Sequence, residues 1–276
     1  VHPNPIEADV EAGAAFYNEH NCDGLLSLGG GSAMDVAKVI RFFANHSAPL
    51  AQYSVLDNGG AKIKGALPPM YAVPTTAGTG SEVGRGAVIT MRGTNRKTLF
   101  VAPPLMPTIA VLEPALTSSL PPHLTAATGI DAFTHCLESY LAPVYHPMAD
   151  GVALEGIRLC LANLQIVVAE GKNLDGRAQM QMAASMGAVA FQKGLGVTHS
   201  LAHALSTVLD MHHGLANAVM LEAAMHFNCE AVPAKFLAMA EVVLPRFAHE
   251  ARALRAPDRP GDCRRPVPSG RAPGRF

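Results

Sequence analysis

The sequence predicts an α/β domain followed by an all-helical domain. Strand and helix patterns alternate over the first part of the chain, proline interrupts it at residues 120–123, and the later segments have the apolar spacing of helices. A chain of 276 residues is long enough for one large domain or two ordinary ones. We therefore place an α/β domain at residues 1–117, a helical domain at 118–250 and a separate tail at 251–276.

The composition is that of a globular protein without a basic surface. Hydrophobic residues make up 49% of the chain and charged residues 16%, a balance that argues against disorder. The formal net charge of -1 predicts no nucleic acid and no membrane surface as a partner. The five cysteines form no CxxC pair, no apolar run is long enough to span a membrane, and no signal-like segment opens the chain, so we expect a cytoplasmic protein.

The first elements form a strand, turn and helix unit. Residues 9–20 have apolar side chains at helical spacing, and DGLLSLGGGS follows as a buried strand that runs into glycines. A second helix is predicted from Ser32, whose hydroxyl is a plausible N-cap.

Three further strands are predicted at residues 70–74, 86–90 and 108–114. Because strands and helices alternate, we expect them to join a largely parallel sheet.

After residue 123 the sequence predicts helices only. They cover residues 124–142, 149–170, 176–194, 197–209 and 214–228. The tail at 251–276 is rich in Arg and Pro and lacks an apolar period, which predicts disorder. A shifted reading frame and a natural basic tail both fit this composition.

The helical region contains two pairs of metal-binding residue types at helical spacing. Asp131 and His135 are four residues apart, as are His199 and His203, and His213 follows ten residues later. Imidazole nitrogens and a carboxylate suit a divalent ion such as Fe²⁺ or Zn²⁺. The alternative is that these histidines are hydrogen-bonded core residues. His212 points elsewhere on any regular backbone, so we expect it to be structural or exposed.

Two loops of small residues follow predicted strands. GGGSAMD at 29–35 precedes a helix N-terminus, where free N–H groups favour a phosphate, and PTTAGTGSEV at 74–83 adds hydroxyl groups. Together they favour a pyrophosphate site. The spacing is not G-x-G-x-x-G, so a merely tight turn remains the alternative for the first loop.

With these motifs the chain resembles the iron-containing, group III alcohol dehydrogenases. The matching segments lie within residues 1–245: VHPNP, CDGLLSLGGGSAMDVAK, PTTAGTGSEV, LPPHLTAATGIDAFTHCLESY and GVTHSLAHALSTVLDMHHGLANAVML. The resemblance implies a Rossmann-like dinucleotide-binding domain, a helical metal-binding domain and a metal between them. The implied cofactors are Fe²⁺, with Zn²⁺ as the alternative, and NAD or NADP.

The resemblance also assigns residues by motif. The implied metal ligands are Asp131, His135, His199 and His213, whereas His203 would lie near the nicotinamide and relay the proton. The implied nucleotide contacts are Gly30, Gly31, Ser32, Thr75, Thr76, Thr79, Ser81 and Lys97.

The predicted function is a metal-dependent alcohol dehydrogenase acting on a small alcohol or aldehyde, as a homodimer or larger assembly. Maleylacetate reductase-like and glycerol dehydrogenase-like activities remain alternatives. Family members carry a further strand and helix before VHPNP, so we expect this sheet to lack a strand. A catalytically silent chain that at most binds metal is therefore a third possibility.

Overall fold

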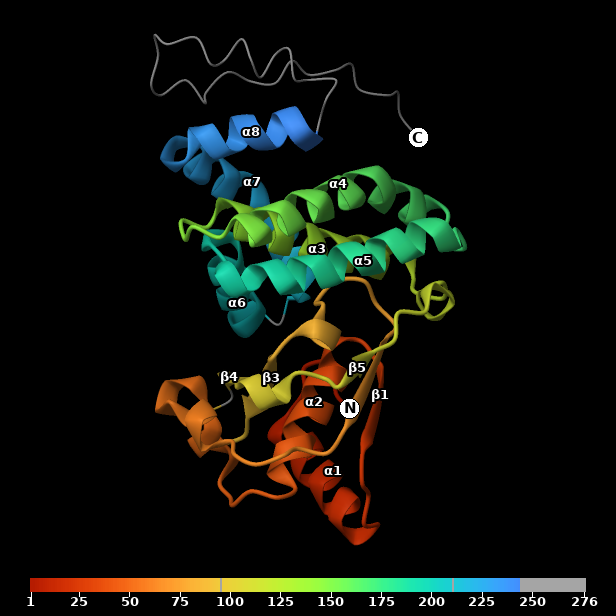
Figure 1. Cartoon of the computed structure of the whole chain (residues 1–276), viewed down its shortest axis with the longest axis vertical. Helices are drawn as coiled ribbons and strands as arrows, with labels where there is room; N and C mark the ends of the chain where they lie inside the picture. Colours follow the sequence, from red (N-terminus) through yellow and green to blue (C-terminus); the bar gives the residue numbers. More distant parts are fainter. Residues whose placement is uncertain (95, 210, 244–276) are drawn as a thin grey trace.

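The computed structural model describes residues 1–94, 96–209 and 211–243 (Figure 1). Strands β1 to β5 and helices α1 and α2 occupy the lower part of the view, and α3 to α8 form the upper part. This arrangement confirms the predicted fold class. The described strands end at Ala110 and α3 begins at Pro122, which agrees with a division near residue 117, although that boundary stays a prediction. The predicted tail at 251–276 lies outside the described residues.

A parallel sheet forms the scaffold of the first part. Its strand order is β1 (Leu25–Gly29), β2 (Met70–Pro74) and β5 (Ile109–Ala110), and Leu25 pairs with Met70. Helix α2 (Gly31–Phe43) packs on one face of this sheet through Met34 and Ala37. On the other face Leu26 and Leu28 are exposed.

The strand prediction was wrong in two details. The segment that begins at Gly86 is not part of the parallel sheet: β3 (Gly86–Met91) pairs antiparallel with β4 (Arg96–Val101), which was not predicted. The segment 108–114 forms only the two-residue strand β5. The hairpin packs against α2 and α1 (Glu7–Glu19) in one apolar core, whose members include Val10, Phe42 and Phe100.

Ser32 is not the N-cap of α2. The helix begins at Gly31 with Gly30 as its N-cap, and the Ser32 hydroxyl donates to the Pro3 carbonyl oxygen at 2.6 Å. The hydroxyl therefore anchors the start of the chain instead of capping the helix.

Helices make up the second part, as predicted. They are α3 (Pro122–Leu141), α4 (Pro147–Ala169), α5 (Leu174–Ala190), α6 (Val197–Leu209), α7 (His213–Ala231) and α8 (Pro233–Val243). The last of these, α8, was not predicted. Helices α3, α4 and α5 pack together around a core that combines larger apolar side chains with alanines such as Ala132, Ala153 and Ala183.

Helix α4 is long and apolar enough to cross a membrane by length and composition, with a mean hydropathy of 1.6. It packs against α3 and α5 and buries Ala153, Ile157 and Cys160. These three side chains belong to the core of the helical part.

Candidate functional site

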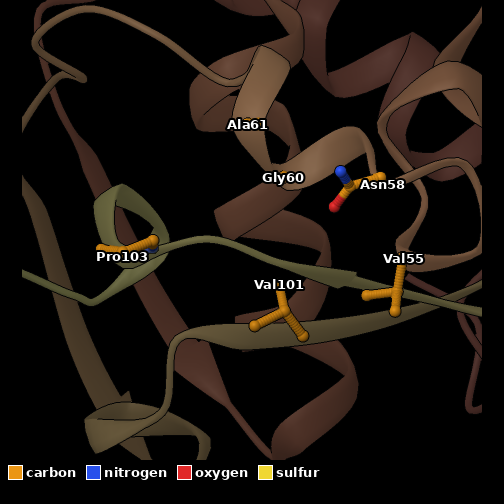
Figure 2. Close-up of a pocket in the computed structure, with 6 residues that line it drawn as sticks. All are labelled: Val55, Asn58, Gly60, Ala61, Val101 and Pro103. Atoms are coloured by element: carbon orange, nitrogen blue, oxygen red, sulfur yellow. The ribbon is translucent and has the colours of Figure 1, made fainter.

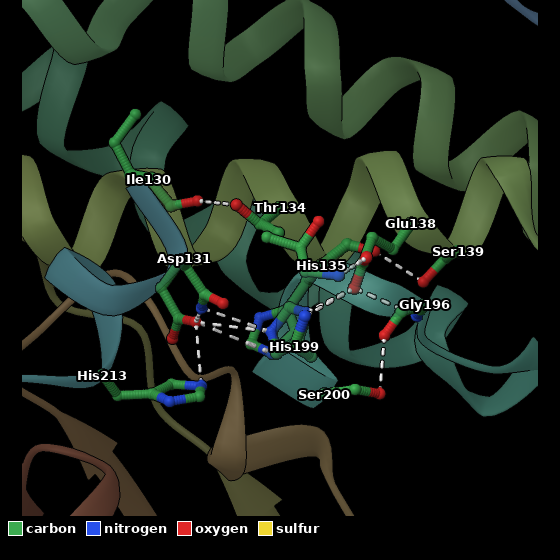
Figure 3. A network of polar contacts seen from close by, with 12 residues as sticks. Ile130, Asp131, Thr134, His135, Glu138, Ser139, Gly196, His199, Ser200 and His213 are labelled. Atoms are coloured by element: carbon green, nitrogen blue, oxygen red, sulfur yellow. Dashed lines mark hydrogen bonds and ion pairs between the residues drawn. The ribbon is translucent and has the colours of Figure 1, made fainter. Parts of the chain in front are cut away.

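Four sequence-predicted residues meet where α3, α6 and α7 come together (Figure 3). Asp131 and His135 lie one turn apart on α3, His199 is in the first turn of α6 and His213 is the first residue of α7. Asp131, His135 and His199 are buried, whereas His213 keeps part of its surface. The structure thus brings together all four predicted metal ligands.

One carboxylate oxygen lies at the centre of this cluster. The Nε2 atoms of His199 and His213 are each 3.6 Å from Asp131 Oδ1, and that of His135 is 3.9 Å away. Candidate ligand atoms of Asp131, His135 and His199 all lie within 4.8 Å of one another.

These separations fit a shared metal ion. They are too long for hydrogen bonds, whereas nitrogen and oxygen ligands held at about 2.1 Å from one ion are roughly 3.4 Å apart in a tetrahedral arrangement. A donor set of three imidazoles and a carboxylate also suits Fe²⁺ or Zn²⁺.

The ionisation states of Asp131, His135 and His213 favour the binding of a cation. Burial opposes ionisation of Asp131, but the surrounding His135, His199 and His213 prevail and hold the pKa of its carboxyl well below the usual range. Burial lowers the pKa of His135 and of His213 to about 4, so both are neutral near pH 7. An ionised carboxylate and neutral imidazoles are the forms that bind a metal.

Two buried residues that the sequence analysis missed hold the ligands. Glu138 on α3 accepts a hydrogen bond from His199 Nδ1 at 2.7 Å. Asn217 on α7 donates through Nδ2 to Asp131 Oδ1 at 2.8 Å. Helical spacing could have found both, because Glu138 is three residues after His135 and Asn217 four after His213.

His203 lies at the exposed side of the cluster. Its ring centroid is 4.9 Å from that of His213. Partial burial lowers the pKa of His203, and the charges of His199 and Lys97 lower it further. Lys97 belongs to β4, so the charge that acts on His203 comes from the α/β part.

The two loops of small residues face each other. A Cβ atom on Gly30 would lie 3.4 Å from the Thr76 methyl carbon, and one on Gly31 would lie 2.6 Å from that of Thr79. The N–H of Thr75 donates to the Gly29 carbonyl oxygen at 2.9 Å, which continues the pairing of β1 and β2. The predicted nucleotide residues of both loops are therefore neighbours at the carboxyl ends of parallel strands, where α/β folds bind ligands.

Ser81 is held by a buried polar network. Its hydroxyl donates to Asp35 Oδ1 at 2.8 Å and accepts from Lys38 Nζ at 2.7 Å. Burial lowers the pKa of Lys38 to about 8 even though Asp35 and Glu82 favour its charged form. This network fixes the end of the second loop, a role for Ser81 that the sequence analysis did not anticipate.

Helix α5 fixes the same loop from the helical side. Ser185 donates to Glu82 Oε1 at 2.7 Å, and Gly80, at a φ of +61°, lies so close to α5 that an added Cβ would be 2.3 Å from the Ala188 Cβ. The loop is thus clamped between the network around Lys38 and α5.

A hollow of about 390 Å³ lies elsewhere on the α/β part (Figure 2). It is lined by Val55, Asn58, Gly60, Ala61, Val101 and Pro103. These side chains are uncharged and none belongs to the helices of the histidine cluster, so the hollow is separate from the candidate site.

Comparisons with known proteins agree with these motifs. The family model described as iron-containing alcohol dehydrogenase matches residues 1–114. A second, described as the C-terminal part of the Fe-containing alcohol dehydrogenase family, matches residues 125–256.

Individual proteins similar to this chain are a dehydrogenase, an oxidoreductase and a reductase. The chain is 44% identical to 4-hydroxybutyrate dehydrogenase of Cupriavidus necator over 92% of its length, and spans 66% of that relative. It is similar to the crystal structure of a 1,3-propanediol oxidoreductase with a TM-score of 0.86 and 38% identity, covering 92% of this chain and 68% of the other. Sulfoacetaldehyde reductase from Bifidobacterium kashiwanohense, solved with NAD⁺, has a TM-score of 0.75 and 31% identity over 82% of this chain and 60% of its own.

Proposed function

Because the chain belongs to the iron-containing alcohol dehydrogenase family, we propose that it transfers hydride between a small alcohol, or the corresponding aldehyde, and a nicotinamide cofactor. The observation that carries this proposal is the convergence of three imidazole nitrogens on one oxygen of Asp131, beside two facing loops of small residues.

Asp131, His135, His199 and His213 would hold the metal ion, for which Fe²⁺ is our first choice and Zn²⁺ the second. When bound, such an ion supplies Lewis-acid polarisation of the alcohol or aldehyde oxygen. The protein's own part is to keep Asp131 ionised and His135 and His213 neutral, and to bury the ligand cluster. Burial and the charge pattern described above support both roles.

His203 would move the proton. Alcohol oxidation releases a hydride and a proton, and the lowered pKa of His203 leaves the imidazole neutral and able to accept that proton near pH 7. Its exposed position beside His213 would allow the proton to pass on to solvent.

Gly30, Gly31 and Ser32 would receive the pyrophosphate at the N-terminus of α2. Thr75, Thr76, Thr79, Ser81 and Lys97 would surround the rest of the nucleotide. The NAD⁺ complex of the sulfoacetaldehyde reductase supports NAD as the first cofactor to test, with NADP as the second.

The names of the relatives suggest a substrate class. One acts on 4-hydroxybutyrate and another on 1,3-propanediol, both short chains with a terminal hydroxyl and a second polar group at the other end. We propose the same class here, together with a cytoplasmic location and a homodimer or larger assembly.

The test is turnover by the purified 276-residue chain, loaded anaerobically with Fe²⁺ or with Zn²⁺. Formation of NADH or NADPH is followed with 4-hydroxybutyrate, 1,3-propanediol and ethanol. We expect metal-dependent turnover that His199→Ala abolishes, and that His226→Ala, a matched change at an exposed histidine of α7, leaves intact. Absence of turnover with every substrate and both metals would refute the proposal.

A further inference from the structure

Glu138 is a buried carboxylate that the proposed chemistry does not use. It lies on α3, three residues after His135, and only 1% of its surface is exposed. A side chain buried this far has to find its hydrogen-bond partners inside the helical part.

Four N–H groups point at this carboxylate: the backbone N–H of Gly196, just before α6, and the backbone and ring N–H groups in the first turn of α6. Oε2 accepts from His199 Nδ1 at 2.7 Å, from the Gly196 N–H at 3.0 Å and from the His199 N–H at 3.2 Å, and Oε1 accepts from the Thr198 N–H at 2.6 Å. A Cβ on Gly196 would lie 2.7 Å from Oε1, so glycine allows this close approach. These contacts attach the N-terminus of α6 to α3.

The hydrogen bond to the ring has a chemical consequence. Both oxygens of Glu138 already accept from backbone N–H groups, so the carboxylate acts as an acceptor and the His199 Nδ1 atom carries the hydrogen. In the neutral imidazole the lone pair then lies on Nε2, the atom that faces Asp131 Oδ1 at 3.6 Å. Carboxylates that orient metal-binding histidines in this way commonly raise metal affinity by roughly 10- to 100-fold.

We propose that Glu138 is a positioning residue, which fixes the tautomer and direction of His199 so that its Nε2 atom serves the metal site. The proposal rests on the metal site described above and requires no particular substrate. If Glu138 only capped α6, substituting it would weaken metal binding equally with and without the His199 ring. The experiment therefore compares the effect of substituting Glu138 in both backgrounds.

The experiment is a titration of the metal-free 276-residue chain with Co²⁺, followed by the visible absorption of the bound ion. The variants are Glu138→Gln, His199→Ala and the double variant, with Glu155→Gln as a control because Glu155 is a partly exposed carboxylate on α4. Circular dichroism and thermal melting of the metal-free proteins check that each variant folds.

We expect Glu138→Gln to weaken Co²⁺ binding roughly 10- to 100-fold and to shift the absorption band towards that of His199→Ala. In the His199→Ala background the same change should alter affinity less than about threefold, because the positioned ring is already gone. Glu155→Gln should match the wild type. If Glu138→Gln fails to fold, Glu138→Asp, which keeps the charge but withdraws it by one methylene, is expected to give a smaller loss with the same dependence on His199.

An equal loss in both backgrounds, or wild-type affinity and spectrum in Glu138→Gln, would overturn the proposal. If the wild type bound no Co²⁺, both this inference and the proposed function would fail. Co²⁺ binding without turnover of any alcohol would count against the proposed function alone, because the titration contains no substrate.

Discussion

Gly214 places His213 beside Asp131 at the proposed metal site, and Gly214→Ala should displace it. Gly214 follows His213 in the first turn of α7, and a Cβ atom there would lie 2.0 Å from the Ala127 carbonyl oxygen and 2.5 Å from its carbon. Ordinary contacts between such atoms are longer than about 3 Å. Both neighbours are backbone of α3, so the first turn of α7 has to move away by about 1 Å.

This displacement sets the expected loss of Zn²⁺ affinity. A ligand nitrogen at about 2.1 Å from a metal would end near 3 Å, which removes one of four ligands. We expect Zn²⁺ binding to weaken at least tenfold. Alanine is favoured over glycine inside a helix by about 0.5–1 kcal/mol, but the overpacking costs about 1–3 kcal/mol, so the metal-free chain should be less stable.

Zn²⁺ affinity is measured by competition with a chelator, and stability by urea unfolding of the metal-free protein. Gly151→Ala is the matched control, since a Cβ at Gly151 in α4 meets no atom within 4 Å, and it should be neutral or stabilising without effect on Zn²⁺. If Gly214→Ala behaved like Gly151→Ala in both assays, the argument that glycine brings His213 to the site would be wrong.

Three further predictions concern the loops and the charge of the site. Gly80→Ala forces a side chain into a left-handed conformation against Ala188. It should lower the free energy of unfolding by about 2–4 kcal/mol and weaken NADH binding. A urea midpoint equal to that of the wild type would contradict this prediction. Lys38→Met leaves the buried carboxylates of Asp35 and Glu82 without their cation. It should lower the free energy of unfolding, measured in urea, by about 3–5 kcal/mol. A decrease below about 1 kcal/mol would show that the protein does not need this cation. Although burial opposes it, neighbouring carboxylates including Glu138 raise the pKa of metal-free His199 to about 9, so Zn²⁺ must displace a proton below that pH. Zn²⁺ affinity should therefore rise by about tenfold per unit between roughly pH 6 and 9 and then level off, and a flat profile from chelator competition would contradict this.

Much of the site could be predicted because its residues come in helical pairs. Asp131 with His135, and His199 with the following His203, appear in the sequence at a spacing of four, and the structure turns three of them towards one point. Periodicity does not show how helices face each other. The contact between Glu138 and the first turn of α6 therefore became visible only when α3 and α6 were placed together.

The strands were harder to predict, for a physical reason. The segment that forms β4 begins with Arg96 and Lys97 and does not alternate between apolar and polar side chains, so its pairing with β3 depends on contacts outside the strand. Ser32 shows the same limit at a helix start, because its hydroxyl finds the Pro3 carbonyl oxygen from another segment instead of the N–H groups of its own helix. Local propensity is overruled where a distant partner is available.

The proposed metal site is tested most directly by the amount of metal bound per chain after equilibrium dialysis against Fe²⁺ under anaerobic conditions, or against Zn²⁺. We expect about one ion per chain in the wild type and a large loss of bound metal in Asp131→Asn, since all three imidazole nitrogens gather around the Asp131 carboxylate. No bound metal in the wild type, or equal binding by Asp131→Asn, would mean that the histidine cluster is a set of core residues and not a metal site.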